Sequence, residues 1–364
     1  MRIAIDAHSL DTQSGGNEVY TENLINSLSQ LDKENEYLIY TNPKIRLNLP
    51  INYKIIKIHT KNRLMRSLYL SNRVKKDSPD IYHGQYFLPL FCNCHSVITI
   101  HDVSFRSHPE WFTNQEKIIF KFVNNSLKKS KRIIAVSNFT KGEILRFFDI
   151  NENKISVIYN GVSDIFRPNI DDTKISKVKA KYSLPDNFIL YVGRFNVRKN
   201  ISTLVKAFSI FKKQNKSDFK LILVGKYDWK SENLKRLIIK LYLSDEIKFI
   251  NYLPYVELPL IYNAAKLFVF TSFYEGFGLP PLEAMACGIP TITSDIPVFC
   301  ELIEDANIKV NPYDTEGLAK VMGKLTFDEH LRKHMVSKGL EIANRYRWKN
   351  TARETLNIYK ELIK

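Results

Sequence analysis

The stretch LFVFTSFYEGFGLPPLEAMACGIPTITSD, residues 267–295, predicts a strand, a glycine-bearing turn, a short helix and a second strand in succession. LFVFTS and IPTITSD are short apolar runs of the kind that form buried strands. Between them, the Pro280-Pro281 pair favours a helix start and Gly288 favours the helix end. A strand, a helix and a strand in this order are typical of a parallel α/β sheet.

The same alternation extends over the whole chain, where apolar runs rich in Ile, Val and Tyr are separated by longer amphipathic stretches. Near-continuous apolar strands joined by helices predict parallel sheets that are covered on both faces. Helical patterns with apolar residues at i, i+3 and i+4 include 200–214 and 233–243. The predicted strands are 2–7, 37–41, 53–58, 80–84, 96–102, 132–137, 155–161, 188–194, 219–225, 247–253, 267–272, 289–295 and 307–310.

These strands are more than a single open sheet usually contains, so we expect two domains. Segment 164–187 is polar and carries two prolines ahead of a fresh strand, which predicts the break. The expected fold class is α/β, with two doubly wound, Rossmann-like parallel-sheet domains, 1–168 and 169–346, and a final helix in 347–364. Because such sheets bind ligands at the carboxyl ends of their strands, we expect the two domains to face a shared cleft lined by those loops.

The charge balance and the cysteine content indicate which kinds of partner and which compartment suit the chain. Lys and Arg number 54 against 38 Asp and Glu, a formal net charge of +16 spread over both halves of 364 residues. This excess suits nucleic acid, an anionic membrane surface, phosphorylated small molecules, or simply a solvated basic surface. Four cysteines are too few for a disulfide framework and lack metal-site spacing, so we expect reduced, mostly buried thiols and a cytosolic protein.

Several other classes are disfavoured by what the sequence lacks. No apolar run approaches ~20 residues, so we expect no membrane-spanning helix. The N-terminal apolar run is too short and too polar for a signal peptide. No G-x-G-x-x-G fingerprint occurs, which argues against a nicotinamide dehydrogenase.

Two carboxylates flank the turn in the opening stretch: Glu275 lies on the loop, and Glu283 is expected in the first helical turn. The N–H groups of that helix start suit an anion such as phosphate. A metal pair is disfavoured because no nearby His or Asp supplies further ligands. A glycosidase-like acid/base pair is disfavoured because the carboxylates lie on opposite sides of the helix start. Two carboxylates that each accept hydrogen bonds from sugar hydroxyls fit better; the alternative for Glu283 is that it only complements the helix dipole.

The loop YVGRFNVRKN, residues 191–200, places Arg194 and Lys199 five residues apart after a strand. Arg offers planar bidentate donors and Lys a point charge, and together they could clamp a diphosphate. The alternative is a solvated basic turn, since Arg198 adjoins them.

Two further candidates follow strands in the first half of the chain. His101 and Asp102 come directly off a strand, where His101 could donate to a sugar hydroxyl or, in a structural role, to a backbone carbonyl. After the first strand, Gly15 and Gly16 would let the backbone approach a ligand ahead of a helix start that favours an anion.

Taken together, these motifs resemble the retaining glycosyltransferases of the GT-B fold, in the large family 4, and the resemblance covers nearly the whole chain. In order and spacing, the motifs that carry it are SGG (14–16), HD (101–102), VSNFTK (136–141), NGVSDIFRP (160–168), VGRFNVRKN (192–200), LVGK (223–226) and the E-x7-E segment EGFGLPPLE (275–283).

The resemblance implies an acceptor-binding first domain, a nucleotide-sugar-binding second domain, and a C-terminal helix that crosses back onto the first. Arg194 and Lys199 match the diphosphate-binding pair. Glu275 matches the glutamate that faces the donor sugar, and Glu283 the one that holds the ribose. Further positions that match donor-binding residues are Gly15, Gly16, Tyr252, Leu253, Gly276, Phe277, Gly278 and Leu279.

The resemblance also implies the chemistry. His101 matches the histidine near the transferred sugar, so the expected catalytic set is His101, Glu275, Arg194 and Lys199, with no cofactor and no metal. The leaving diphosphate takes the acceptor proton and the configuration is retained, which requires no enzymic nucleophile.

The stretch HDVSFRSHPEWF (101–112) resembles the O-antigen and capsule mannosyltransferase branch, so GDP-mannose is the first expected donor and a saccharide or lipid-linked saccharide the expected acceptor. GNEVY (16–20) departs from a Gly-x-Gly-Arg-Tyr-type stretch of mannosyl-active members. The alternatives are a UDP-sugar donor, a sugar phosphorylase or nucleotide-sugar epimerase on the same fold, and a basic nucleic-acid-binding protein. We expect no nucleic-acid partner, because the basic residues are spread and no RRM, KH or helix-turn-helix signature occurs.

Two stretches of the first domain, 61–76 and 114–132, mix basic residues with Leu, Ile, Phe and Tyr. Such stretches can dock an anionic bilayer, which predicts a cytoplasmic protein held peripherally on the inner face of the cytoplasmic membrane. The alternative is that the apolar residues pack on the core and the lysines are merely solvated.

Overall fold

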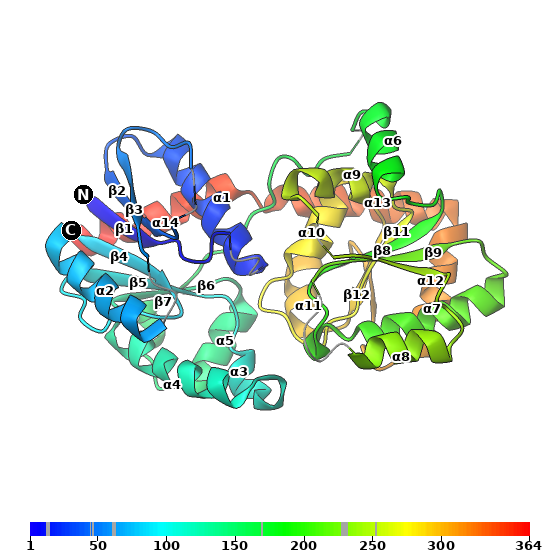
Figure 1. Ribbon diagram of the computed structural model, residues 1–364, viewed down its shortest axis with the longest axis horizontal. Coiled ribbons are helices and arrows are strands. Elements are labelled where there is room, and N and C mark those ends of the chain that lie inside the picture. The colour runs from blue at the N-terminus through cyan, green and yellow to red at the C-terminus, as the bar shows by residue number, and fades with distance from the viewer. Residues whose placement is uncertain are drawn as a thin grey trace. The chain divides into compact units, whose positions relative to one another are not determined.

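The computed structural model describes residues 1–11, 15–43, 45, 47–59, 63–168, 170–226, 232–251 and 253–364. The chain forms two compact units, Met1–Gly161 with Arg347–Lys364, and Val162–Tyr346 (Figure 1). The predicted boundary lies after residue 168, but the chain enters the second unit at Val162. Segment 162–168 belongs there because Phe166 is buried and packs edge-on against Tyr262 at 5.8 Å.

The first unit is built on a seven-stranded parallel sheet in the order β3-β2-β1-β4-β5-β6-β7. Ile3 of β1 pairs with Tyr37 on one side and with Ile81 on the other, so the order reverses between β1 and β4. In open parallel sheets, ligands bind outside the carboxyl ends of the strands at such a switch point. The strands are β1 (Arg2–Asp6), β2 (Glu36–Thr41), β3 (Tyr53–Lys57), β4 (Ile81–Gln85), β5 (His95–Ile100), β6 (Arg132–Ala135) and β7 (Ile155–Val157).

The final helix is part of this first unit, although it follows the second unit in sequence (Figure 1). Trp348 meets Tyr20 of α1 edge-on at 5.8 Å, and the Thr351 hydroxyl donates to the Tyr159 carbonyl at 2.7 Å. A Cβ at Gly161 would lie 2.0 Å from the Trp348 nitrogen, so only glycine permits this close approach. The unit's helices are α1 (Gly16–Leu31), α2 (Arg63–Asp77), α3 (Ser104–Ser107), α4 (Asn114–Lys129), α5 (Asn138–Phe147) and α14 (Trp348–Ile363).

The second unit repeats the plan with a six-stranded parallel sheet in the order β10-β9-β8-β11-β12-β13, whose switch point lies between β8 and β11. Its strands are β8 (Phe188–Val192), β9 (Lys220–Val224), β10 (Ile247–Ile250), β11 (Leu267–Phe270), β12 (Thr291–Ser294) and β13 (Ile308–Val310). Its helices are α6 (Asp172–Lys181), α7 (Ile201–Asn215), α8 (Glu232–Lys240), α9 (Leu258–Ala264), α10 (Leu279–Ala286), α11 (Pro297–Ile303), α12 (Thr315–Phe327) and α13 (Glu329–Arg345).

Every predicted strand is present, and the strands inside each sheet are buried along most of their length, as runs covered on both faces require, whereas the edge strands β3, β7, β10 and β13 are only partly buried. Several strands end earlier than predicted. Strand β7, for example, ends at Val157, and Tyr159 beyond it contacts α14 through a hydrogen bond between its carbonyl and the Thr351 hydroxyl. The cysteines form no disulfide, but the prediction of mostly buried thiols is wrong: Cys287 is buried, Cys92 and Cys94 are half-buried, and Cys300 is exposed. Among the described helices, none has the length and apolarity needed to cross a membrane.

Candidate active site

The basic loop predicted after β8 lies along the end of β9. The Gly193 amide donates to the Val224 carbonyl at 2.9 Å, and the Phe195 amide donates to the Lys226 carbonyl at 3.0 Å. Gly225 has a φ of 148°, and a Cβ there would lie 1.9 Å from the Gly193 carbonyl oxygen. The glycine of LVGK is therefore what lets the loop approach so closely.

Lys199 is held in place through its backbone. The Lys199 amide donates to Asn196 Oδ1 at 3.2 Å, and the Thr271 hydroxyl, just beyond β11, lies 3.2 Å from the Lys199 carbonyl. Its side chain forms an ion pair with Glu275, and the Lys199 and Glu275 side chains are 12% and 8% exposed. The Lys199 ammonium also lies 5.0 Å from the centre of the Phe270 ring. Two predicted site residues, 76 positions apart in sequence, thus meet at the switch point of the second sheet.

The turn that carries Glu275 is fixed from both sides. The Phe273 amide donates to the Arg198 carbonyl at 2.8 Å, which ties this turn directly to the basic loop. Phe277 is buried against Tyr346, with ring centres 5.8 Å apart. Gly278 has a φ of 94°, and a Cβ there would lie 2.4 Å from the Phe299 ring. Gly276, Phe277 and Gly278 therefore form a rigid backbone turn beside Glu275.

Helix α10 begins at Leu279, directly after this turn, with proline in its first turn and no side-chain cap at Gly278. The prediction that Glu283 lies in the first helical turn is wrong, because the helix accommodates both Pro280 and Pro281 and so begins earlier. Glu283 lies in the second turn, so complementing the helix dipole does not explain it. Pro280 and Pro281 have no N–H, so Leu279 supplies the amide at this helix start, and the N-cap residue Gly278 makes no side-chain cap hydrogen bond.

Glu283 is buried, and its surroundings differ from those of Glu275. The Tyr262 hydroxyl donates to Glu283 at 3.1 Å. Burial raises the pKa of Glu283 to about 7, although the Tyr262 hydrogen bond opposes that shift. One glutamate of the E-x7-E segment is thus paired with a cation, and the other is held near its titration midpoint at neutral pH.

The remaining predicted residues of the second unit are Arg194, Leu253 and Tyr252. Arg194 is exposed beside Gly193, and its guanidinium forms no ion pair with any residue that the structure describes. Leu253 follows β10, which is the edge strand and lies two places from β8. Tyr252 lies outside the described residues.

In the first unit, His101 follows β5 and lies 2.8 Å, through Nε2, from Gln85 Oε1 at the end of β4. The Gln85 amide nitrogen donates to the Thr21 hydroxyl, which itself donates to the Asn17 carbonyl at 2.7 Å. In this orientation of the Gln85 amide its oxygen faces His101, which places the imidazole proton on Nε2 and leaves Nδ1 as an acceptor.

Burial lowers the pKa of His101 to about 4, although the neighbouring Asp102 carboxylate favours the charged form. His101 is therefore neutral near pH 7. Asp102 itself accepts hydrogen bonds from the Ser104 amide at 2.9 Å and the Ser104 hydroxyl at 2.6 Å, so it shapes the start of α3.

The glycine pair after β1 is described only in part, since residues 12–14 lie outside the described chain. Gly15 has a φ of 71°, and its carbonyl accepts from the Glu18 amide at 3.0 Å, which starts α1. Gly16 is the first residue of that helix, and a Cβ there would meet nothing within 4 Å.

Two polar residues at the switch point of the first sheet were not predicted as site residues. Gln85 positions His101, and Asp6, the last residue of β1, pairs with Arg66 at 3.0 Å. Burial opposes ionisation of Asp6, but His8 and Arg66 outweigh it and hold its pKa below the usual range. A polar residue at the end of an otherwise apolar strand, next to a strand-order reversal, is the signal that could have found both.

Two family models match the chain. "Glycosyl transferases group 1" matches residues 172–341, within the second unit, and "Glycosyltransferase Family 4" matches residues 14–164, largely within the first.

Relatives and solved structures agree with these matches. O-antigen chain mannosyltransferase B of Escherichia coli is 32% identical over 285 residues, which cover 78% of this chain and 74% of the relative. The chain spans only 33% of the length of a longer mannosyltransferase of the same species. Sucrose-phosphate synthase of Thermosynechococcus elongatus has a TM-score of 0.82 at 21% identity, covering 100% of this chain and 99% of the other. Anabaena HepE in complex with UDP-glucose has a TM-score of 0.78 at 17% identity, covering 99% and 100%.

Proposed function

Because the chain belongs to the group 1 glycosyltransferases of family 4 and has their GT-B fold, we propose that it transfers mannose from GDP-mannose to a saccharide or lipid-linked saccharide acceptor. The observation that carries the proposal is the buried Lys199–Glu275 pair beside the uncapped start of α10, at the switch point of the second sheet. The mannosyltransferase relative supports the choice of sugar. The second candidate is a UDP-sugar donor, which the HepE complex with UDP-glucose favours.

In the proposed donor site, residues of different chemistry bind different parts of the nucleotide sugar. Arg194, Lys199 and the amides near Leu279 hold the diphosphate, because all three present N–H donors to an anion. Glu275 accepts hydrogen bonds from the sugar hydroxyls and Glu283 from the ribose. In the first unit, the ring of His101 offers a neutral Nδ1 that can accept a hydrogen bond from a sugar hydroxyl.

The proposed reaction is metal-independent transfer with retention. The bond between the anomeric carbon and the diphosphate oxygen breaks, and a bond from that carbon to the acceptor oxygen forms on the same face. The acceptor proton goes to the departing diphosphate. Negative charge builds on the leaving oxygens, and preorganised cations and amides stabilise it most in the transition state.

A thermal-shift panel with GDP, UDP, ADP and their sugar conjugates tests the donor. We expect GDP-mannose to raise the melting temperature most. Glu275→Gln should abolish the extra shift of GDP-mannose over GDP, because Glu275 is assigned to the sugar, while Lys199→Met should weaken both shifts. A larger shift with UDP conjugates would replace GDP-mannose by the second candidate, and turnover that depends on inorganic phosphate or interconverts the free donor would indicate a phosphorylase or an epimerase.

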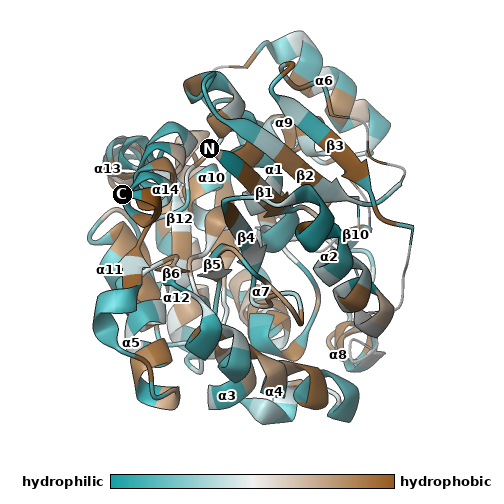
Figure 2. Ribbon diagram, turned by 90° about the vertical axis from the view of Figure 1, so that its left-hand side faces the viewer, coloured by the Kyte–Doolittle hydropathy of each residue, from teal (hydrophilic) through white to brown (hydrophobic). Residues whose placement is uncertain are grey.

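Peripheral attachment to an anionic membrane is the second part of the proposal. Helices α2 and α4 carry both hydrophobic and hydrophilic residues along their length (Figure 2). Some of the apolar residues pack on the core, as Leu70 and Leu127 do, but others on these helices and on the loop before β5 are exposed. The exposed ones are Met65, Leu68, Tyr69, Leu90, Phe91, Ile118 and Phe122.

Exposed apolar side chains among lysines suit an anionic lipid surface. At low salt, we expect the protein to sediment with phosphatidylglycerol vesicles and not with phosphatidylcholine vesicles. Phe91→Ser and Phe122→Ser should each reduce that sedimentation, whereas no sedimentation with either lipid would end the membrane proposal.

A further inference from the structure

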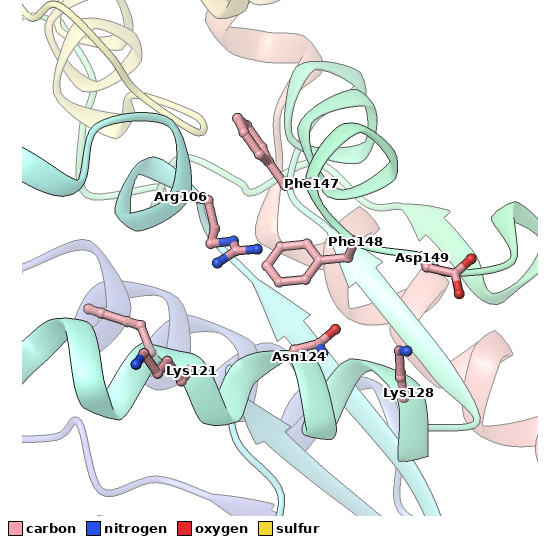
Figure 3. Close-up of a pocket in the computed structure, with 8 residues that line it drawn as sticks. Arg106, Lys121, Asn124, Lys128, Phe147, Phe148 and Asp149 are labelled. Carbon is pink, nitrogen blue, oxygen red and sulfur yellow. The ribbon is translucent and has the colours of Figure 1, made fainter.

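A pocket of about 360 Å³ lies in the first unit, between α3, α4 and the end of α5, and no residue of the candidate active site lines it (Figure 3). Arg106 enters it from α3, Lys121 and Lys128 come from α4, and the aromatic rings of Phe147 and Phe148 form a wall. Ligand pockets span about 300–1,000 Å³. This pocket lies at the lower end of that range, which suits a small head group.

The cations of the pocket are placed there by local structure. Lys121 and Lys128 are seven residues apart on α4, two helical turns, so they share one face of that helix. The Arg106 guanidinium lies 5.4 Å from the centre of the Phe148 ring, which holds it at the pocket wall.

The pocket carries an excess of positive charge. Within the described chain, neither Arg106 nor Lys121 nor Lys128 forms an ion pair, whereas Arg66 and Arg73 of the same unit each have a carboxylate partner. Asp149 is the acidic residue that lines the pocket, so the cations outnumber it. Cations that line one pocket without a carboxylate partner suit an anion with more than one negative charge, such as a phosphate monoester or a diphosphate.

An apolar surface adjoins this charge. Ile118 and Phe122 are 58% and 59% exposed, and as residues four apart they lie on one face of α4, next to the face that carries Lys121. Large apolar side chains left in water beside a basic pocket serve no purpose for an inorganic anion. They offer a surface for a hydrocarbon chain attached to the anion.

The pocket is separate from the site around His101. Phe120 of the pocket wall stacks on Phe105 with ring centres 4.4 Å apart, and Tyr86 lies between this pair and His101, at 6.2 Å from Phe120 and 5.7 Å from His101. This aromatic layer fills the space between the two.

We propose that this pocket binds the phosphate group of a phosphorylated amphiphile, with Arg106, Lys121 and Lys128 around the phosphate and the apolar chain over Ile118 and Phe122. The proposal concerns binding alone and stands whether or not the donor is GDP-mannose.

The test is calorimetric titration of the whole chain with decyl phosphate below its micelle concentration, without nucleotide sugar. Lys121→Glu and Lys128→Glu should each lower the affinity by about tenfold or more, because each removes a charge-assisted contact and adds a repulsive one. The matched control is Lys129→Glu, which makes the same charge change on an exposed neighbour outside the pocket and should lower the affinity less than about twofold. An equal loss in Lys129→Glu would overturn the proposal, because it would indicate a general effect of surface charge.

Two further titrations test which kind of phosphate compound the pocket binds. Phe122→Ser should lower the affinity for decyl phosphate several-fold and leave the affinity for pyrophosphate unchanged, since only the amphiphile contacts the apolar surface. Equal affinity of the wild-type protein for pyrophosphate and decyl phosphate would overturn the assignment to an amphiphile.

The second titration uses dihexanoyl phosphatidylcholine, whose phosphate charge is neutralised by choline. It should bind no better to the wild type than to Lys121→Glu. A loss of affinity in Lys121→Glu as large as that for decyl phosphate would overturn the role of the cations. Unchanged melting temperatures in the variants establish that they are folded.

Discussion

The two sheets share a strand order, but the side chains that gather at their switch points differ in charge. Between β8 and β11 of the second sheet, Lys199 and Glu275 form a buried ion pair beside an uncapped helix start. Between β1 and β4 of the first, Gln85 holds a neutral His101 in one tautomer. Topology therefore determines where polar side chains collect, and the sequence of each loop determines whether they suit a diphosphate or a hydroxyl group.

The largest test of this difference is removal of the charges in the second unit. We expect Lys199→Met and Glu275→Gln each to lower the transfer rate by on the order of 10²–10³-fold, as loss of one preorganised contact to a developing charge does in other enzymes. Initial rates with saturating donor measure the effect. Lys266→Met, an exposed lysine of the same unit, is the control and should transfer at the wild-type rate. A wild-type rate in either site variant would remove that residue from the active site.

The second test concerns the backbone that brings the basic loop to the sheet. Gly225→Ala places a Cβ 1.9 Å from the Gly193 carbonyl, so the loop must shift, and we expect a loss of about 3 kcal/mol or more in the free energy of unfolding. Gly142→Ala in α5 of the first unit is the control. Its Cβ meets nothing within 4 Å, and alanine is the better helix former, so a gain of about 0.5–1 kcal/mol is expected. Urea titration measures both, and similar values for the two variants would contradict the close approach.

The sequence predicted the strands well because both sheets are buried on both faces, which leaves an apolar run wherever a strand passes. It also predicted Lys199 and Glu275 as site residues, since charged residues on the loops that follow strands of a parallel sheet lie where such sheets bind ligands.

It could not predict their ion pair, because that contact depends on the loop geometry that Gly225 and Thr271 impose. Gln85 was missed for a related reason: a single polar residue at a strand end is informative only once the strand order shows that it faces the switch point. Glu283 was misplaced because prolines mark a helix start without showing whether they stand before or inside the first turn.

The third test uses pH, to which the two units should respond in opposite directions. The pKa of Glu283 is raised from 4.5 to about 7, so its proton is held more tightly in the folded state. That stabilisation is complete below pH 4.5 and is lost as the pH rises to 7, roughly 3 kcal/mol in all. The pKa of His101 is lowered from 6.5 to about 4, so its contribution is complete above pH 6.5 and is lost as the pH falls to 4.

Urea unfolding of Glu283→Gln and His101→Asn between pH 4 and 7.5 separates the two contributions. Relative to the wild type, Glu283→Gln should gain stability as the pH rises, and His101→Asn should lose it. Glu316→Gln, at an exposed glutamate, should follow the wild-type curve. Curves for the two site variants that run parallel to the wild type would contradict the opposite burial effects.

The smallest test asks whether Gln85 positions His101 or only fills the core. In Gln85→Leu, the Nε2–H of His101 loses its acceptor, so the ring no longer prefers one tautomer and Nδ1 is an acceptor for only part of the time. We expect about a tenfold fall in kcat, the loss of one hydrogen bond, while the KM for the donor changes little. Ring ¹⁵N shifts of His101 report the tautomer directly.

In Gln85→Glu the carboxylate would instead face Nε2 and raise the pKa of His101, so the pH profile of the transfer rate should move toward higher pH. If Gln85→Leu lowers stability but leaves both the ¹⁵N shifts and kcat unchanged, the network of the first unit is structural, and only the charged loop of the second takes part in the reaction.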